Sequence, residues 1–244
     1  MTEGPMLKHA KVKANQELDM ANTYVVVPVF NEATVIESVI ETLRDYFPNI
    51  VTINDGSSDS TRAVLHQLPV VSLNHLINLG QGAALQTGIN YALSQGAKWI
   101  ITFDSDGQHK PEDAYNMLAT LQQGDSCDVV IGSRFRGQAV NMPLSKRILL
   151  KTVVNARKLL TNSKLTDTHN GLRAMNRKAA TVVAITQNRM AHASQIIRQF
   201  NNANLNILEA PITIEYTQYS LNKGQSSLNA INILFDLLVG RLLR

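Results

Sequence analysis

The chain has 244 residues, of which 44% are hydrophobic and 17% charged, a composition typical of a globular protein that buries a core. Its one cysteine, Cys127, excludes an internal disulfide framework and a cysteine-based metal cluster, and it agrees with the reducing cytoplasm. No apolar stretch approaches the roughly 18 residues that a membrane-spanning helix needs. These features exclude an integral membrane protein and predict a soluble or peripheral, cytoplasmic one.

The net charge of +4 is distributed unevenly. Between Val129 and Thr166 the chain has no acidic residue and eight basic ones, so the rest of the chain is net acidic. Such a segment indicates contact with phosphates or with an anionic membrane surface, or it is simply the solvated face of a basic helix. A nucleic-acid partner is disfavoured, because the rest of the chain is acidic and aromatic residues are not interleaved with the basic ones.

The first 22 residues are polar and aperiodic, which predicts a flexible N-terminal lead-in. From Thr23 onwards, short apolar runs alternate with helical patterns. The predicted strands are 24–29, 50–53, 70–73, 99–103 and 129–131, and the predicted helices are 32–47, 60–68, 82–94 and 111–122. This alternation with short connections predicts one mostly parallel sheet that helices cover on both faces.

After Arg134 the pattern changes. We expect a basic amphipathic helix over 145–160, a short strand over 171–175, helices over 178–185 and 192–201, and strands over 205–208 and 212–216. The last predicted helix, 226–244, is apolar over more than half of its circumference. Such a helix is typical of a core or of a seam between subunits, and a helix that lies in a membrane interface is the alternative.

Polar side chains follow the ends of several predicted strands. Asn31 and Glu32 follow the first strand, Asp55 ends the second, and Asp104 and Asp106 follow the fourth. The carboxyl ends of parallel strands meet at one edge of a sheet, where such folds bind ligands. Two carboxylates there suit Mg²⁺ or Mn²⁺, which are held by one or two carboxylates together with water and nucleotide phosphates. The alternative interpretations are structural: Asn31 caps a helix, and the two aspartates sit on a solvated turn.

The neighbouring strand ends add groups that suit a nucleotide. Pro28 cannot donate a ladder hydrogen bond, so we expect the chain to leave regular pairing there. Asp55 either forms a turn or accepts hydrogen bonds from a nucleobase or a ribose. Gly80 and Gly82 begin a helix, where glycine permits close backbone approach and the helix N-terminus favours an anion. Arg134 follows the fifth strand and could clamp a phosphate with two hydrogen bonds.

Five segments in this order resemble family 2 glycosyltransferases, in particular the branch that contains dolichyl-phosphate mannose synthase and bacterial polyprenyl-phosphate sugar transferases. They read P-V-F-N-E, N-D-G-S-S-D-S-T, N-L-G-Q-G-A-A-L-Q-T-G, D-S-D-G-Q-H-K-P-E-D and G-S-R-F. The resemblance covers about 23–137 and extends more loosely through D-T-H-N-G-L-R-A-M to K-G-Q-S. It implies an α/β fold of the GT-A type, a Rossmann-like three-layer arrangement with a mostly parallel central sheet and C-terminal helices. The nucleotide-sugar-binding half would be 23–137, the acceptor-side half of the same domain 138–225, and the C-terminal amphipathic helix 226–244.

The resemblance also implies roles for individual residues. The residues that would bind the nucleotide sugar are Pro28, Phe30, Glu32, Ile53, Asp55, Gly82, Asp104, Ser105 and Asp106. A Mg²⁺ or Mn²⁺ ion would be held by Asp104, Asp106 and Gln108. The acceptor or its phosphate would be bound by Arg134, Arg173 and Lys223, and the catalytic residues would be Asp106, Arg134 and Asp167. The chain departs from the family pattern in carrying Gln81 for a lysine, Asn170 for a serine, Leu221 for an arginine and Ser227 for a lysine.

The implied reaction is a metal-dependent, inverting transfer of a sugar from a UDP- or GDP-linked donor to a polyprenyl phosphate or another envelope glycolipid, at the inner face of the cytoplasmic membrane. One alternative acceptor is a saccharide hydroxyl in cell-wall, capsule or lipopolysaccharide synthesis. A hydroxyl would need a base, for which Asp167 and His192 are candidates. The alternative of another class is a non-catalytic protein that binds nucleotide sugars. The C-terminal helix would join subunits if the protein is a homo-oligomer.

Overall fold

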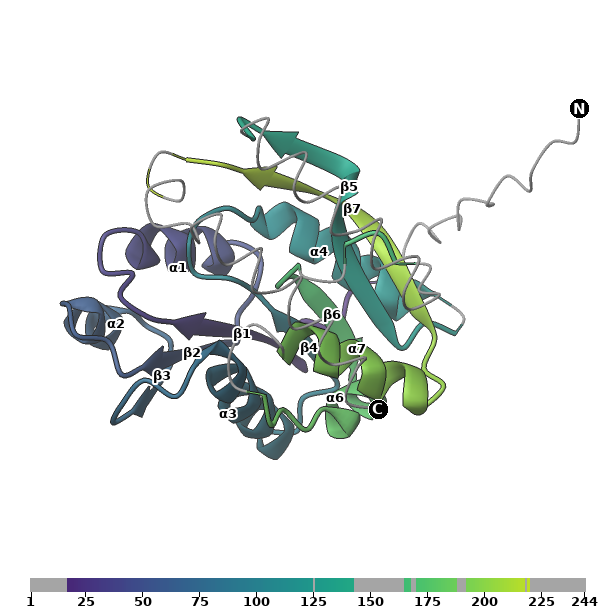
Figure 1. Cartoon of the computed structure of the whole chain (residues 1–244), viewed down its shortest axis with the longest axis horizontal. Helices are drawn as coiled ribbons and strands as arrows, with labels where there is room; N and C mark the ends of the chain where they lie inside the picture. The colour runs from purple at the N-terminus through teal and green to yellow at the C-terminus, as the bar shows by residue number, and fades with distance from the viewer. Residues whose placement is uncertain are drawn as a thin grey trace, which may run out of the picture.

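The computed structural model describes residues 17–124, 126–142, 165–167, 170–187, 192–217 and 219 (Figure 1). The strands are β1 (Thr23–Val29), β2 (Ile50–Asp55), β3 (Val71–His75), β4 (Trp99–Thr102), β5 (Val129–Val140), β6 (Arg173–Asn176) and β7 (Ile207–Glu215). The helices are α1 (Ile36–Arg44), α2 (Thr61–Gln67), α3 (Gln81–Ser94), α4 (Pro111–Gln123), α6 (Arg177–Val182) and α7 (His192–Asn202). The predicted helix 145–160, the predicted helix 226–244 and Lys223 lie outside the described residues.

The strands form one seven-stranded sheet in the order β3-β2-β1-β4-β6-β5-β7. Every neighbouring pair is parallel except the two pairs that β6 makes, with β4 and with β5. The prediction of a mostly parallel sheet is therefore confirmed. The carboxyl ends of β1, β2, β3 and β4 meet at one edge, which we call the carboxyl edge.

Helices cover both faces of the sheet, which makes three layers (Figure 1). One buried cluster joins the sheet to α1, α2 and α4, through residues such as Ile40 and Met117. A second joins the opposite face to α3, α6 and α7, through residues such as Ile89 and Phe200. Packing also begins before the predicted start of the fold, since the side chain of Leu18 is buried in the first cluster. Among the described residues, no helix is both long enough and apolar enough to cross a membrane.

Pro28 stays inside β1, so the prediction that regular pairing ends there is wrong on the side of β2, where Pro28 lies opposite Ile53. On the other side, the C=O of Val26 accepts a hydrogen bond from the N–H of Phe103, and the pairing with β4 ends at this point. Alternate residues of a strand direct their backbone groups to opposite neighbours. The nitrogen of Pro28 therefore points to the side that β4 has already left, and no ladder bond is lost.

Helix α1 begins at Ile36 and not at the predicted Glu32. Asn31 has a φ of 54°, and the C=O of Glu32 accepts hydrogen bonds from the N–H groups of Val35 and Ile36. The segment before α1 is therefore a turn. Asn31 does not cap the helix, because its Oδ1 accepts a hydrogen bond from the N–H of Ser58 and so joins the turns that follow β1 and β2.

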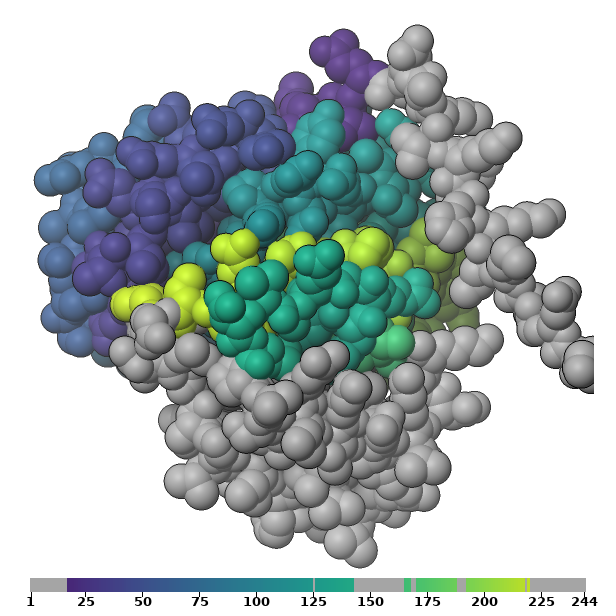
Figure 2. Space-filling model, turned by 90° about the horizontal axis from the view of Figure 1, so that it is seen from above, coloured from purple at the N-terminus to yellow at the C-terminus, as the bar shows by residue number. Residues whose placement is uncertain are grey.

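The far end of the sheet is longer than predicted. β5 continues past Ile131 to Val140, and β7 is one strand where two were expected. The two strands lie side by side at the surface, with a register shift between Ser133 and Gln138 (Figure 2). The last residues of β5 are exposed, so no alternation of buried side chains marks them in the sequence. Pro211 is tolerated in β7 because β7 is an edge strand.

Candidate active site

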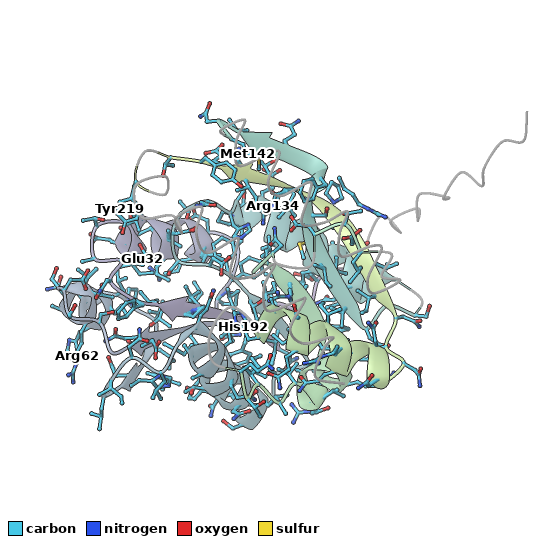
Figure 3. The ribbon with its side chains drawn as sticks, in the orientation of Figure 1. Glu32, Arg62, Arg134, Met142, His192 and Tyr219 are labelled. Carbon is cyan, nitrogen blue, oxygen red and sulfur yellow. The ribbon has the colours of Figure 1, made fainter. Side chains whose placement is uncertain are left out.

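Two residues from later in the chain, Thr61 and Tyr219, hold the turn after β1. The N–H of Glu32 donates to Thr61 Oγ1 over 2.8 Å, and the hydroxyl of Tyr219 donates to Glu32 Oε2 over 2.7 Å. Figure 3 shows Tyr219 and Glu32 next to each other at this edge. Glu32 is buried, whereas Phe30 is 41% exposed. This turn thus presents an aromatic ring to solvent beside a buried carboxylate.

Asp55 organises the loop that leads into α3. Its carboxylate accepts hydrogen bonds from the N–H groups of Leu79 and Gly80 and lies 2.7 Å from His75 Nδ1. His75 Nε2 in turn lies 3.0 Å from Thr87 Oγ1. A carboxylate offers about four acceptor positions, so roughly one remains for a ligand. Asp55 therefore shapes the loop before α3, and the predicted contact with a base or ribose has to use the remaining position.

Asp104 is fixed from two sides at the end of β4. Its Oδ1 accepts a hydrogen bond from Gln81 Nε2 over 3.0 Å, and its Oδ2 lies 3.2 Å from His109 Nε2. Gly171 lies so close to this carboxylate that a Cβ at position 171 would overlap it. Asp106 Oδ1 accepts a hydrogen bond from the backbone N–H of Gln108 over 3.1 Å.

The two aspartates differ in their protonation. Burial raises the pKa of Asp106 to about 6, and the negative charge of Asp104 adds to the effect. Burial would also raise the pKa of Asp104, but the hydrogen bond and charge of His109, followed by the charges of Arg173 and His192, bring it below the ordinary value. The two negatively charged carboxylates repel each other, and a cation bound between them would relieve this repulsion.

The donor atoms of this turn fit a hard divalent cation. Asp104, Asp106 and Gln108 lie on one turn and offer carboxylate and amide oxygens, which Mg²⁺ and Mn²⁺ prefer. Within the described part of the chain, no group of three or more His, Cys, Asp or Glu side chains could hold a metal ion by itself. A two-carboxylate site suits an ion that also binds substrate phosphates.

Arg134 is held at the end of the buried half of β5. Its Nε donates to Asp167 Oδ2 over 2.6 Å, its backbone N–H donates to the same oxygen, and its Nη1 donates to the hydroxyl of Tyr216 over 3.0 Å. Burial would lower the pKa of Arg134, but Asp167 and Tyr216 outweigh burial and raise it. The guanidinium stays charged, and several of its five N–H donors remain for a substrate.

Arg173 is a buried arginine close to the carboxylates of Asp104 and Asp167. The side chain is 1% exposed, and none of its three nitrogens has a partner among the described residues. Burial lowers the pKa of Arg173 to about 10, while the charges of Asp104 and Asp167 act in the opposite direction. Nearby in the chain, Asn170 Nδ2 is also buried, and it has no hydrogen-bond partner among the residues that the structure describes. Unpaired buried donors are costly, and an anion bound beside them would remove that cost.

Most of the predicted site residues reach the carboxyl edge. Ser105 is buried between the two aspartates, Gly82 lies buried in the first turn of α3, and Ile53 is buried in β2. His192 is buried at the start of α7, and its charge contributes to the low pKa of Asp104. The predicted ligand Lys223 lies outside the described residues.

The residues of the site that sequence reasoning missed include His109, Tyr216 and Glu209. His109 orients Asp104, and it could have been found because it stands within D-S-D-G-Q-H-K-P. Tyr216 binds Arg134, and Glu209 binds the backbone of Thr166 and Asp167. These two residues lie at the end of β7 and within it, in segments without a motif, so no sequence signal marks them.

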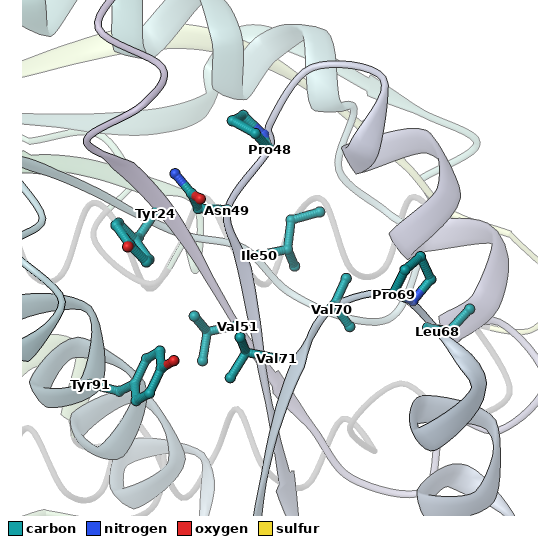
Figure 4. A pocket seen from close by; sticks show the side chains of 10 residues that line it. All are labelled: Tyr24, Pro48, Asn49, Ile50, Val51, Leu68, Pro69, Val70, Val71 and Tyr91. Carbon is teal, nitrogen blue, oxygen red and sulfur yellow. The ribbon is translucent and has the colours of Figure 1, made fainter.

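A pocket of about 370 Å³ lies at the opposite edge of the sheet (Figure 4). It is lined by residues at the amino ends of β1, β2 and β3, among them Tyr24, Val51 and Val71, with Tyr91 from α3. Its described lining holds no acidic or basic side chain. It is therefore unsuited to a diphosphate and separate from the site at the carboxyl edge.

The mostly parallel seven-stranded sheet, covered by helices on both faces, is an α/β fold of the GT-A type. The fold is similar to that of glucosyl-3-phosphoglycerate synthase from Mycobacterium tuberculosis, crystallised with Mn²⁺, UDP and glucosyl-3-phosphoglycerate, with a TM-score of 0.70 and 17% identity over 90% of this chain and 79% of that one. The family model described as glycosyl transferase family 2 matches residues 24–183. The chain belongs to this family and is a glycosyltransferase.

Two relatives match over most of their length. The UDP-N-acetylglucosamine–dolichyl-phosphate N-acetylglucosaminyltransferase of Methanococcus voltae is 30% identical over 238 residues, which cover 88% of this chain and 94% of the relative. The polyprenol monophosphomannose synthase of Mycolicibacterium smegmatis is 26% identical over 219 residues, which cover 84% of this chain and 82% of the relative. The resemblance inferred from the motifs is therefore confirmed at the level of the family.

Proposed function

We propose that the protein is a metal-dependent, inverting glycosyltransferase that moves a sugar from a UDP- or GDP-linked donor to a polyprenyl phosphate. The observation that carries the proposal is a buried arginine, Arg173, close to both Asp104 of the Asp104–Asp106 turn and Asp167, the carboxylate that holds Arg134. The names of the two relatives support a polyprenyl-phosphate acceptor. A lipid acceptor makes the cytoplasmic face of a membrane the proposed place of action.

The donor would lie along the carboxyl edge. Glu32, Phe30 and the remaining acceptor position of Asp55 would contact the nucleoside, and the N-terminus of α3 at Gly82 would face the phosphates. Asp104, Asp106 and Gln108 would hold Mg²⁺ or Mn²⁺, and the bound ion would neutralise charge that develops on the leaving diphosphate. Arg134 would stabilise the same charge and orient the acceptor phosphate.

The acceptor decides whether a base is needed. A lipid phosphate is already anionic near neutral pH and can attack the anomeric carbon directly, whereas a sugar hydroxyl needs a base to take its proton. Asp167 is poorly suited to that task, because its Oδ2 accepts two hydrogen bonds from Arg134. This contact favours the phosphate acceptor over the saccharide hydroxyl.

The test measures sugar transfer directly. Purified protein, Mn²⁺ or Mg²⁺, a radiolabelled nucleotide sugar and a polyprenyl phosphate in detergent should give a labelled lipid that partitions into the organic phase. A thermal-shift screen of UDP- and GDP-sugars identifies the donor, because a ligand that binds the folded state stabilises it. Binding of a donor without transfer to any acceptor would indicate the non-catalytic alternative, and transfer to a saccharide but not to the lipid would contradict the proposed acceptor.

A further inference from the structure

Glu209 is a buried carboxylate on the edge strand β7. Its side chain is 2% exposed, although the strand borders the sheet. In the register of the sheet, Glu209 lies opposite Ile131 of β5, and Ile131 lies opposite Arg173 of β6. A buried carboxylate in this position requires hydrogen-bond donors, because an unpaired buried charge is strongly destabilising.

The donors come from the loop that carries Asp167. Glu209 Oε1 accepts the N–H of Thr166 over 2.6 Å and the N–H of Asp167 over 3.1 Å, and both carboxylate oxygens lie 3.0 Å from Thr166 Oγ1. Thr166 Oγ1 also lies 2.6 Å from Ser133 Oγ of β5. No described helix or strand contains Thr166 or Asp167, so Glu209 ties this loop to the sheet.

The same carboxylate engages the second arginine of β5. Arg136 Nε lies 3.2 Å from Glu209 Oε2, and Arg136 Nη1 donates to the backbone C=O of Glu209. Arg134 pairs with Asp167 instead. The two arginines therefore pair with different acids. The side chain of Arg134 is 14% exposed, whereas that of Arg136 is 44% exposed.

We propose that Glu209 is a positioning residue for the acceptor phosphate. It holds Thr166 and Asp167, Asp167 directs the guanidinium of Arg134, and Arg134 binds the phosphate. This inference rests on the proposed function, in which Arg134 contacts the acceptor. Glu209 acts only through this series of contacts, so its effect should fall on the acceptor phosphate that Arg134 binds and on the order of the loop, while ground-state binding of the donor is unchanged.

The test compares Glu209→Gln with the unmodified protein. Glutamine keeps the size of the side chain but loses the charge and one acceptor oxygen. We expect faster hydrogen exchange at the amides of Thr166 and Asp167. The KM for a short-chain prenyl phosphate should rise roughly ten- to a hundredfold, as small misplacements of a positioned group do. The Mn²⁺-dependent affinity for the donor should change less than about twofold, because Glu209 does not contact the donor site.

Two further variants test whether the effect of Glu209→Gln comes from its contacts with Thr166 and Asp167, from the loss of any carboxylate on β7, or from the loss of the pair with Arg136. Glu215→Gln is the matched control on the same strand, since its pair with Lys110 is about half exposed. It should leave exchange at the two amides and acceptor KM unchanged. Arg136→Gln removes the two contacts of Arg136 with Glu209, to its carboxylate and to its backbone C=O, and should leave the exchange of both amides unchanged. The proposal is overturned if Glu209→Gln leaves that exchange unchanged, if donor affinity falls as much as acceptor affinity, or if Arg136→Gln reproduces the full effect. Because the exchange measurement needs no activity, a failure of the proposed reaction would be seen separately.

Discussion

Arg134 and Asp167 are 33 residues apart in the chain, yet Arg134 Nε lies 2.6 Å from Asp167 Oδ2. The two side chains are only 14% and 5% exposed. A charge-assisted hydrogen bond in this environment is strong and directional. The pair therefore orients a permanent cation at the carboxyl edge, and it occupies one of the two carboxylate oxygens of Asp167.

The substitution Asp167→Asn distinguishes a positioning role of Asp167 from a role as general base. Asp167→Asn keeps an oxygen that can accept from Arg134, so a positioning role predicts a loss of kcat/KM on the order of tenfold, mainly through the acceptor KM. A general base predicts a loss of about a hundredfold or more in kcat, together with a changed pH profile. Steady-state kinetics with varied acceptor concentration distinguish the two outcomes.

Asp106→Asn should stabilise the metal-free fold while it abolishes metal-dependent donor binding. The folded-state pKa of about 6 lies above the ordinary 3.8, so the folded protein binds this proton more tightly than the unfolded chain does. The stability from this group is therefore present below about pH 3.8 and lost as the pH rises through about 6. Without metal, the variant should have the higher Tm at about pH 8 and an equal Tm at about pH 4. An equal Tm at both pH values would contradict the raised pKa of Asp106, which burial and then the charge of Asp104 cause.

Gly171→Ala should weaken metal-dependent donor binding without unfolding the protein. A Cβ at this position overlaps the carboxylate of Asp104, which therefore has to move. Gly96→Ala is the control, because the space around Gly96 is open while its φ of 85° strains an alanine. The control should lose about 1 kcal/mol of stability and keep its affinity for Mn²⁺ and donor. Calorimetric titration of both variants measures the difference, and equal affinities would refute the prediction.

Arg173→Met should raise the stability of the ligand-free protein and lower its affinity for the anionic substrate. The guanidinium is fully buried and has no hydrogen-bond partner among the described residues. The substitution removes the desolvation cost of this charge, and this gain exceeds the lost attraction to Asp104 and Asp167, because burial outweighs those two charges in the pKa of Arg173. Chemical denaturation and substrate titration measure the two effects. A strongly destabilised variant would indicate that Arg173 stabilises the fold, and would contradict its role as an unpaired group that binds a ligand.

The thiol of Cys127 should be unreactive in the folded protein. Burial raises its pKa to about 11, so little thiolate is present at about pH 8, and the thiolate is the reactive form. A thiol reagent should therefore label the protein slowly in buffer and rapidly in denaturant. Since Cys127 is the one cysteine of the chain, the labelling rate reports opening of the fold. Rapid labelling under native conditions would contradict the burial of this side chain.

Periodicity predicted most helices and strands of residues 23–137, because the signals that mark them are local. The apolar run before Asp104 became β4, and Pro111 begins α4 as predicted, with Glu112 and Asp113 in its first turn. The end of β5 and the continuous β7 escaped prediction, because exposed strand residues carry no alternation of buried side chains.

By itself, the sequence determined the alternation of strands and helices, the parallel sheet that follows from it, and the polar turns at the carboxyl edge, including the Asp104–Asp106 turn. Only the tertiary structure decided which acid pairs with Arg134, which loop Glu209 holds, and that Arg173 is buried with no hydrogen-bond partner in the described part of the chain. The physical reason is the distance along the chain over which each interaction acts. Local propensity and periodicity act over a few residues, whereas these contacts join residues 33 to 43 positions apart through the pairing of β5 with β7.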